Sequence, residues 1–387
     1  MSEKSIELEE TKAGKDLYSY QKEAINKIFK SFEESPDDYH LLYQLPTGGG
    51  KTVIFSEIVR QYLKHHKKKA LVLTHRVELS KQTSKMLTEF GVTNKVVDSK
   101  ANLDDQNEYS CFVAMVETLN NRLNDNKFDI SDIGLVIIDE AHYNSFTKLF
   151  EFFDKSFILG VTATPLSSNM KLPMKDNYKE LIVGETIASL IENEFLARAE
   201  VFSYNVGLTS LEVGANGDYT VKSSEDLYTN NEMLSLLIQA YELHAKEKKT
   251  LIFNNGINTS IQVFETFKAA GYPIAHLDNT YSKKDRKMVL KWFKDTPHAI
   301  LTSVSILTTG FDEPTVNTII LNRATKSLGL YYQMIGRGSR ILKSKPTFTV
   351  VDLGNNVHRF GEWGSDLDWQ KIFKSPNYYL DKILSDE

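Results

Sequence analysis

Short apolar stretches alternate with amphipathic stretches along most of this 387-residue chain. Between about residues 17 and 200, the strand-like stretches are HLLYQL, ALVLTH, SCFVAMV, LVIIDE and FILGVTA. They are continuously apolar and flanked by polar turns, which is typical of parallel strands covered by helices on both faces. The intervening SYQKEAINKIFKSF repeats apolar residues at helical spacing from Ala24 to Phe32. This pattern predicts an α/β domain.

A change of composition separates this region from a second one of the same kind. Residues 201–232 are rich in Gly, Asn, Ser and Thr, and GANGD within them indicates a hairpin turn. Further on, strand-like TLIFNN, AILTSV and FTVVDL again alternate with helix-like runs. We therefore predict two tandem α/β domains, each a mostly parallel sheet covered by helices on both faces. The expected ranges are 1–16 for an acidic tail, 17–200 for the first domain, 201–232 for a hairpin and linker region, 233–360 for the second domain and 361–387 for a C-terminal tail.

The negative charge is concentrated at the two ends of the chain. The formal net charge is −5, of which residues 1–16 carry −2 and residues 361–387 carry −3. The body between them holds 40 basic and 40 acidic side chains. A neutral body permits a local basic groove but argues against strong sequence-blind adhesion to DNA. We expect the acidic tails to aid solubility, with the covering of a cleft as the alternative.

Three absences in the sequence indicate a cytoplasmic protein. No apolar run approaches eighteen residues, so no membrane span is expected. The charged N-terminal segment lacks the apolar stretch of a secretion signal. The single cysteine, Cys111, can form neither an internal disulfide nor a zinc site.

The sequence PTGGGKT lies between a strand-like and a helix-like run, which is the context of a phosphate-binding loop. Backbone N–H groups of small residues converge on phosphate oxygens there, and the helix N-terminus adds a favourable partial charge. We expect Lys51 to reach the β- and γ-phosphates and Thr52 to ligate Mg²⁺. The full motif has Gly where this chain has Leu45, and an ordinary glycine turn is the alternative. The residues expected around the phosphates are Thr47, Gly48, Gly49, Gly50 and Lys51.

A pair of carboxylates follows the apolar run LVII at the point where that predicted strand ends. Ligands of α/β sheets bind at the carboxyl ends of the strands. We expect Asp139 to hold Mg²⁺ and Glu140 to orient and deprotonate the attacking water. The alternative for Asp139 is a cap on the following helix.

Four motifs in one order carry a family resemblance. PTGGGKT, DEAH, TATP and QMIGRGSR resemble motifs I, II, III and VI of the superfamily 2 helicases of the DExH group. The stretches HRVELSKQ, GFDEP and VVDLGNNVHRFGEWGSDLDW look most like those of bacterial RadD-type repair helicases and phage UvsW-like enzymes. The resemblance implies two RecA-like domains, ATP and Mg²⁺ as cofactors, and a role in DNA repair.

The resemblance also implies roles for residues outside the phosphate loop. Gln21 would read adenine, although the family usually has Arg and Pro where this chain has Tyr18 and Ser19. Thr162 and Thr164 match the motif that links the ATP state to domain movement.

The motif QMIGRGSR indicates why a second domain is present. It supplies two arginines, which we expect to share one face of a helix. Arg337 and Arg340 would act as arginine fingers, and Gln333 would position water or the γ-phosphate. Gly310 and Asp312 resemble motif V and would face the nucleotide.

The family binds nucleic acid mainly through phosphates, which carry no sequence information. The candidate contacts are Thr74, Arg76, Thr118, Thr302 and Ser303. A hydroxyl at a strand end also serves as a turn partner. Related motif V sequences often have Asp where this chain has Ser305.

The sequence therefore predicts a nucleic-acid-stimulated ATPase that moves on or remodels DNA. Two alternatives stay open: an RNA helicase, and a nucleotide-gated subunit that recruits a nuclease or another repair factor. The sequence DEAH, together with Gln333 opening motif VI, departs from the usual RNA-acting DEAD-box pattern and favours DNA.

Overall fold

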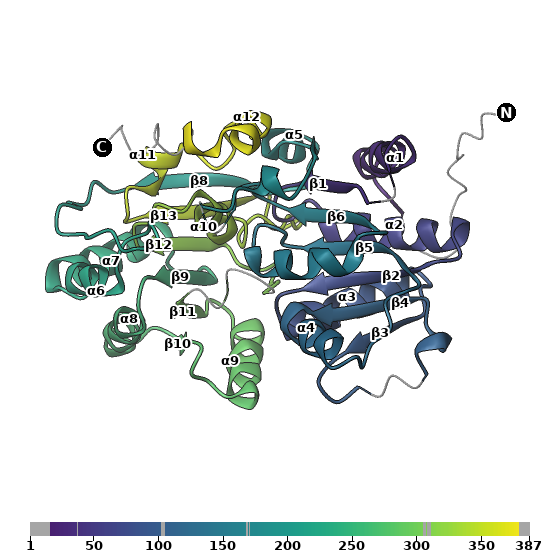
Figure 1. Ribbon diagram of the computed structural model, residues 1–387. Coiled ribbons are helices and arrows are strands. Elements are labelled where there is room, and N and C mark those ends of the chain that lie inside the picture. Colours follow the sequence, from purple (N-terminus) through teal and green to yellow (C-terminus); the bar gives the residue numbers. More distant parts are fainter. Residues whose placement is uncertain are drawn as a thin grey trace. The chain divides into compact units, whose positions relative to one another are not determined.

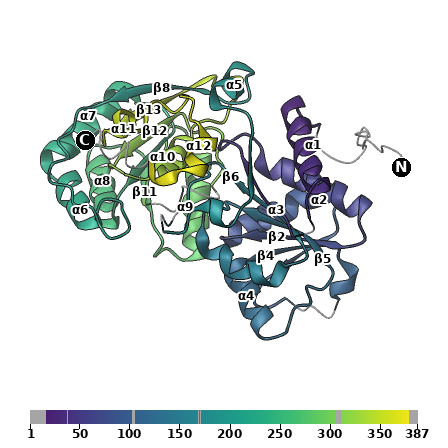
Figure 2. The ribbon, with the colours of Figure 1, turned by 45° about the horizontal axis from the view of Figure 1, so that its top comes forward.

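The computed structural model describes residues 16–36, 38–101, 105–167, 169, 171–304, 307 and 311–378. These residues form two compact units (Figure 1). The first contains the described residues of Met1–Tyr43, Gly50–Thr162 and Met174–Gly184, and the second those of Gln44–Gly49, Ala163–Pro173 and Glu185–Glu387. Each unit has a sheet with helices on both sides, which confirms the predicted α/β class (Figures 1 and 2).

The first sheet has seven strands in the order β3-β4-β2-β5-β6-β1-β7. Their bounds are His40–Gln44 (β1), Lys69–Thr74 (β2), Asn94–Val97 (β3), Cys111–Met115 (β4), Ile133–Asp139 (β5), Phe157–Thr162 (β6) and Glu180–Val183 (β7). The pairs β2·β4, β2·β5, β3·β4 and β5·β6 are parallel. Strand β5 is buried along its whole length, because helices cover both of its faces. The carboxyl ends of β2, β5 and β6 therefore lie along one edge of the sheet.

The helices of the first unit are α1 (Ser19–Glu33), α2 (Lys51–His65), α3 (Val77–Glu89) and α4 (Val116–Asn124), with 3-10 segments at Gln106–Glu108, Asn144–Phe153 and Met174–Asp176. Two of them, α1 and α2, fall on the predicted run SYQKEAINKIFKSF and on the helix-like run after PTGGGKT. In α1 the buried residues Ala24, Ile25, Ile28 and Phe32 repeat at helical spacing.

The second sheet has six strands in the order β10-β11-β9-β12-β13-β8, and all five pairs are parallel. Their bounds are Arg198–Ser203 (β8), Thr250–Asn254 (β9), Ile274–Leu277 (β10), Ile300–Val304 (β11), Thr318–Asn322 (β12) and Thr347–Asp352 (β13). The helices of this unit are α5 (Ile187–Glu192), α6 (Val221–Tyr228), α7 (Asn231–His244), α8 (Ile257–Ala269), α9 (Lys283–Asp295), α10 (Leu328–Ile335), α11 (Asn356–Phe360) and α12 (Trp369–Lys374).

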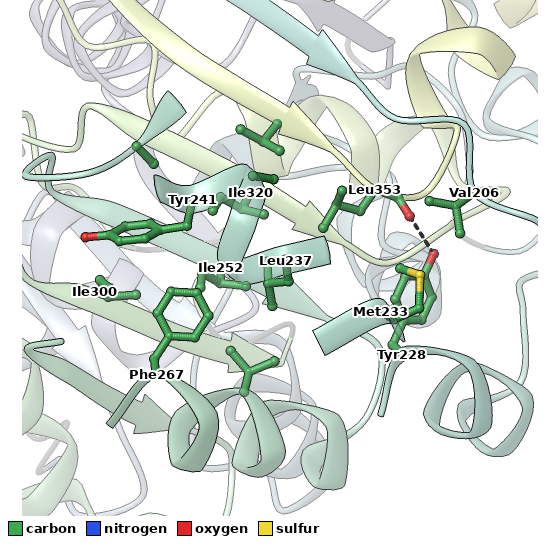
Figure 3. Packing of buried hydrophobic residues seen from close by; sticks show 14 residues of the cluster. Val206, Tyr228, Met233, Leu237, Tyr241, Ile252, Phe267, Ile300, Ile320 and Leu353 are labelled. Atoms are coloured by element: carbon green, nitrogen blue, oxygen red, sulfur yellow. Dashed lines mark hydrogen bonds between the residues drawn. The ribbon is translucent and has the colours of Figure 1, made fainter. Parts of the chain in front are cut away.

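One face of the second sheet packs on α7 and α8 through a cluster of buried apolar side chains (Figure 3). Leu237 of α7, Ile252 of β9 and Phe267 of α8 are all fully buried in it. The Tyr228 hydroxyl donates a 3.1 Å hydrogen bond to the Leu353 carbonyl, which satisfies the polar end of a buried ring. This core fixes the carboxyl ends of the strands from which the motif segments of the second unit emerge.

The segment 201–232 is more ordered than its composition indicates. Its first residues belong to β8, which pairs with β13, so the expected boundary after residue 200 falls inside a strand. The predicted turn is present, with a 2.8 Å hydrogen bond from Gly214 N–H to Asp218 O. The Asp218 carboxylate accepts hydrogen bonds from Thr325 Oγ1 at 2.7 Å and from Arg323 Nη2 at 3.3 Å. The assignment of the expected residue ranges to functional domains stays a prediction.

Two further observations concern the chemistry of the chain. Among the described residues, no helix is both long enough and apolar enough to cross a membrane. Cys111 begins β4 and is fully buried, and burial raises the pKa of its thiol.

Candidate functional site

The glycine loop follows β1 and leads directly into α2, which begins at Lys51. Gly48 and Gly50 have φ values of 92° and 88°, a conformation that residues with a Cβ rarely adopt. A Cβ on Gly50 would also lie 2.7 Å from the Nε2 atom of Gln21. The backbone conformation of the loop therefore requires glycine at both positions. At Gly50 the close approach of Gln21 is a second reason.

Leu45, the departure from the full phosphate-loop motif, has a structural explanation. Its side chain is fully buried, and a Cβ on Gly49 would lie 2.8 Å from its Cγ atom. Gly49 thus provides the space that Leu45 fills, and the Gly49 N–H donates a 3.0 Å hydrogen bond to Pro46 O. The loop keeps a tight turn without the first glycine of the motif.

Gln21 lies beside the glycine loop, where the resemblance places the adenine-reading residue. Its side chain is only 3% exposed, and its Oε1 atom accepts a 3.0 Å hydrogen bond from the Tyr18 N–H. The Tyr18 ring is 53% exposed and stacks on Tyr20, with 6.0 Å between the ring centroids. An exposed ring beside a buried amide is an arrangement suited to a flat heterocycle.

Asp139 ends β5 and Glu140 follows it at the carboxyl edge of the sheet. Burial and the neighbouring charge of Glu140 raise the pKa of Asp139, whereas the charge of Lys51 lowers it. Lys51 and Asp139 therefore interact electrostatically, although one begins α2 and the other ends β5. Glu140 has a φ of 55°, an uncommon value for a residue with a side chain. Backbone strain of this kind is often found at functional sites.

His142 was not assigned a role from the sequence beyond its place in DEAH. Its ring Nδ1 lies 3.0 Å from Thr162 Oγ1 and 3.5 Å from Glu140 Oε2. Burial lowers the pKa of His142. Further along, Thr164 is buried, and the Ala163 carbonyl accepts a 3.1 Å hydrogen bond from Gln44 Nε2. The last residue of β6 is thus tied to the DEAH segment, and the residue that follows it is tied to the end of β1.

The donor set suits Mg²⁺ bound to a triphosphate. Mg²⁺ usually takes one or two protein carboxylates, with phosphate and water oxygens completing its shell. Thr52 in the first turn of α2 and Asp139 at the end of β5 supply a hydroxyl and a carboxylate. Among the described residues, no cluster of three or more His, Cys, Asp or Glu side chains forms an all-protein metal site.

The expectation that Arg337 and Arg340 lie on one helix is wrong. Helix α10 ends at Ile335, Arg337 lies in the turn that follows, and Arg340 forms an isolated bridge with Leu196. Gly338, within this turn, packs closely on the sheet, since a Cβ there would lie 2.3 Å from a ring atom of Phe348. This position of the turn therefore requires glycine.

The turn after α10 is held by contacts within the second unit. Arg337 Nη1 donates a hydrogen bond to Phe311 O, and Arg340 Nε donates one to Asp312 Oδ1 at 2.9 Å. The buried Lys345 ammonium donates to Gly338 O at 2.7 Å and to Val316 O at 2.9 Å. Burial, with a smaller effect of Arg340, lowers the pKa of Lys345 to about 8.

The other expected residues of the second unit are placed as follows. Gln333 lies in α10 and is buried. Asp312 is half exposed in its contact with Arg340. Gly310 and Ser305 lie outside the described residues.

Three of the five candidate nucleic-acid contacts are buried. Thr74 Oγ1 shares a 2.7 Å hydrogen bond with Ser80, which fixes the start of α3. Thr302 Oγ1 accepts a 2.8 Å hydrogen bond from Asn254 Nδ2, and Ser303 is also buried. The hydroxyls of Thr74 and Thr302 thus make interior hydrogen bonds, whereas Arg76 and Thr118 are partly exposed.

Two family models match the chain. Residues 14–167 match the res subunit of type III restriction enzymes, and residues 231–342 match the helicase conserved C-terminal domain. PTGGGKT, DEAH and TATP lie within the first match, and QMIGRGSR lies within the second.

Curated relatives match most of the chain. It is 29% identical over 357 residues to the putative ATP-dependent helicase IRC3 of Saccharomyces cerevisiae, covering 87% of this chain and 51% of that protein. A 51.5 kDa protein of a Lactococcus phage is 28% identical, with 86% and 70% covered. The ATP-dependent DNA helicase uvsW of Enterobacteria phage T4 is 21% identical, with 93% and 72% covered. The chain thus spans about half the length of the yeast relative.

Solved structures share the fold. A fragment of a putative HsdR subunit of a type I restriction enzyme from Vibrio vulnificus superimposes with a TM-score of 0.69 at 21% identity, covering 89% of this chain and 65% of that chain. S. cerevisiae Dbp5 bound to RNA and ADP BeF3 gives a TM-score of 0.57 at 15% identity, with 95% and 98% covered. At these identities the likeness concerns the fold alone.

Proposed function

Because the chain belongs to the superfamily 2 helicases, we propose that it hydrolyses ATP at the glycine loop and uses the energy to move on or remodel DNA. One observation carries the proposal: at the carboxyl edge of the first sheet, Asp139 is buried at the end of β5 and feels the charges of both Lys51, which begins α2, and Glu140. A cation beside two carboxylates after a glycine loop suits a triphosphate with its metal ion.

In this proposal the glycine loop and the carboxyl edge of the first sheet bind and activate the nucleotide. Backbone N–H groups from Thr47 to Lys51 hold the phosphates, and the Lys51 ammonium neutralises the β- and γ-phosphate oxygens. Thr52 and Asp139 hold Mg²⁺, which offsets the charge that develops on the phosphates. Glu140 accepts a proton from the attacking water. Gln21 reads the adenine edge through its buried amide.

The second unit supplies positive charge to the same triphosphate. Arg337 and Arg340 act as arginine fingers, with Gln333 placing the water or the γ-phosphate. The turn after α10 holds these arginines. Within it, the Lys345 ammonium donates a hydrogen bond to the carbonyl of Gly338, which lies between the two arginines in the sequence. Asp312 orients Arg340 through the 2.9 Å hydrogen bond. Gly310 is proposed from the motif alone.

Movement follows from the need for groups of both units. Closed states are favoured while the triphosphate is intact, and open states after phosphate loss. Thr162 and Thr164 report the nucleotide state to the second unit. Arg76 and Thr118 are the contacts best placed to grip strand phosphates, since Thr74, Thr302 and Ser303 have buried hydroxyls.

ATP turnover with matched nucleic acids tests the substrate. Single-stranded, duplex and forked DNA, and RNA of the same sequences, are compared at equal nucleotide concentration. We expect DNA to raise turnover more than RNA does. A larger response to RNA would favour the RNA helicase, and no response to any strand would refute the proposal.

The recruiting subunit is the second candidate function. A strand-displacement assay with the isolated chain separates the recruiting subunit from the motor. Robust unwinding without any partner would exclude a purely recruiting role. A nuclease or repair factor is the kind of partner proposed. A reducing, cytoplasmic location is proposed from the single buried cysteine.

A further inference from the structure

The imidazole of His75 is an exception among the buried polar groups of the first unit. Both of its ring nitrogens are inaccessible to solvent, and neither has a hydrogen-bond partner among the described residues. Buried polar groups nearly always have such a partner, so a histidine lacking one needs an explanation. His75 is the first residue after β2 and directly precedes the candidate strand contact Arg76.

The sheet register places His75 beside the proposed general base. Strands β2 and β5 are parallel neighbours, and Leu73 lies opposite Ile138. Continued two residues beyond this pair on each strand, the same register brings His75 to the level of Glu140. Burial lowers the pKa of His75 to about 4, and the charge of Glu140 opposes that shift. The two side chains therefore interact electrostatically.

A series of tilted ring contacts holds His75 in place. Its ring packs against Tyr143, with 4.3 Å between centroids and 34° between planes. The Tyr143 ring packs in turn against His142, with 4.3 Å and 38°. His142 then contacts Glu140 and Thr162 through its ring Nδ1 atom. Glu140 is thus flanked by two imidazoles, one with a protein partner and one without.

We propose that His75 is a positioning residue for Glu140 that acts when a strand is bound. This inference rests on the proposed function. A strand phosphate on Arg76 moves the adjoining backbone, and the His75 ring N–H then donates a hydrogen bond to the Glu140 carboxylate. That bond fixes the carboxylate for accepting the water proton. Without a strand the bond is absent, which accounts for the unsatisfied nitrogens.

Two substitutions separate the ring from its nitrogens. His75→Phe keeps a ring for Tyr143 to pack against but removes both nitrogens, whereas His75→Gln keeps an N–H donor. ATP turnover is measured at saturating ATP, with and without saturating single-stranded DNA, and the stimulation ratio is compared. We expect His75→Phe to lower the ratio at least tenfold and His75→Gln to stay within threefold of the unsubstituted chain. DNA affinity should change less than twofold in both.

The second unit offers a matched control. Phe202 stacks on His244 with 3.9 Å between centroids, and Phe202→Ala removes an aromatic–histidine pair of the second unit, to which β2 does not belong. Its stimulation ratio should equal that of the unsubstituted chain. Tyr143→Leu removes the ring that orients His75 and should lower the ratio as His75→Phe does. It decides the case if His75→Phe does not fold.

Three results would overturn the inference. The first is an unchanged ratio in His75→Phe, and the second is an equal loss in His75→Gln. The third is a loss that more DNA restores, which would make His75 a strand contact. A chain that no strand stimulates even without substitution would instead refute the proposed function, so the two failures are distinguishable.

Discussion

His142 and Thr162 share a hydrogen bond of 3.0 Å between the imidazole Nδ1 and the hydroxyl Oγ1. His142 follows the carboxylates at the end of β5, and Thr162 is the last residue of β6. Both are buried, so the bond forms in a medium of low dielectric constant, where it is stronger than in water. It joins the segment that would act on ATP to the segment proposed to report the nucleotide state.

Replacement of Lys51 tests the phosphate site. Lys51→Ala removes the cation that acts on Asp139. We expect ATP turnover to fall about a hundredfold or more, the scale of losing one strong electrostatic contact to a transition state. The fold, followed by circular dichroism, should stay intact. The control is Lys67→Ala, an exposed lysine just beyond the other end of α2, and equal losses in both variants would refute the assignment.

Replacement of Arg337 separates binding from hydrolysis. Arg337→Ala should keep nucleotide affinity within a fewfold and lower turnover by roughly a thousandfold, as expected for an arginine finger. Fluorescent nucleotide binding and steady-state turnover supply the two numbers. Arg198→Ala, at an exposed position of β8, is the control. Collapsed affinity with unchanged turnover per bound nucleotide would contradict the finger role.

Lys345 supports the turn between the two arginines. Lys345→Met leaves two buried carbonyls without their donor, at about 1–3 kcal/mol for each unsatisfied group. We expect the second unit to lose about 2 kcal/mol or more of stability and turnover to fall, with nucleotide affinity little changed. Lys343→Met, at an exposed neighbouring position, should do neither. Urea denaturation and turnover check both parts, and wild-type turnover in Lys345→Met would show that the turn needs no such support.

The buried His75 predicts a pH dependence of stability. Its pKa is about 4 in the folded protein, below the ordinary value of 6.5. Between these values the unfolded chain binds more protons, so this contribution is complete above pH 6.5 and is lost as the pH falls toward 4. The loss is on the order of 3 kcal/mol at most. His75→Phe should lack this loss. The unfolding free energies of the two proteins are measured by urea denaturation at pH 7 and at pH 4.5. Between these pH values, the unfolding free energy of the unsubstituted chain should fall relative to that of His75→Phe by nearly that amount.

Parallel stability curves of the two proteins across this range would contradict the prediction. They would indicate that the ring is solvated in solution.

The elements that short-range patterns determine could be predicted from the sequence. Continuous apolar runs identified β2, β5 and β6, because each is covered on both faces. The glycine loop was recognisable because left-handed φ values at Gly48 and Gly50 require glycine. The short strands β3 and β7 were missed, because four residues leave little periodicity to detect.

Features set by distant contacts could not be predicted. The turn at Arg337 contains Gly338, whose close packing on Phe348 joins residues ten positions apart in the chain. The buried hydroxyls of Thr74 and Thr302 share hydrogen bonds with Ser80 and Asn254, neither of which marks a strand-binding motif. The ring series through Tyr143 requires the register between β2 and β5, which single-strand patterns do not contain.

The most direct test of the account is a structure of the chain with a non-hydrolysable ATP analogue, Mg²⁺ and single-stranded DNA. We predict that the phosphates lie on the backbone N–H groups from Thr47 to Lys51, with Mg²⁺ between Thr52 and Asp139. The Arg337 guanidinium should contact the γ-phosphate. An analogue bound away from this loop, or Arg337 and Arg340 both remote from the phosphates in the ternary complex, would contradict the account.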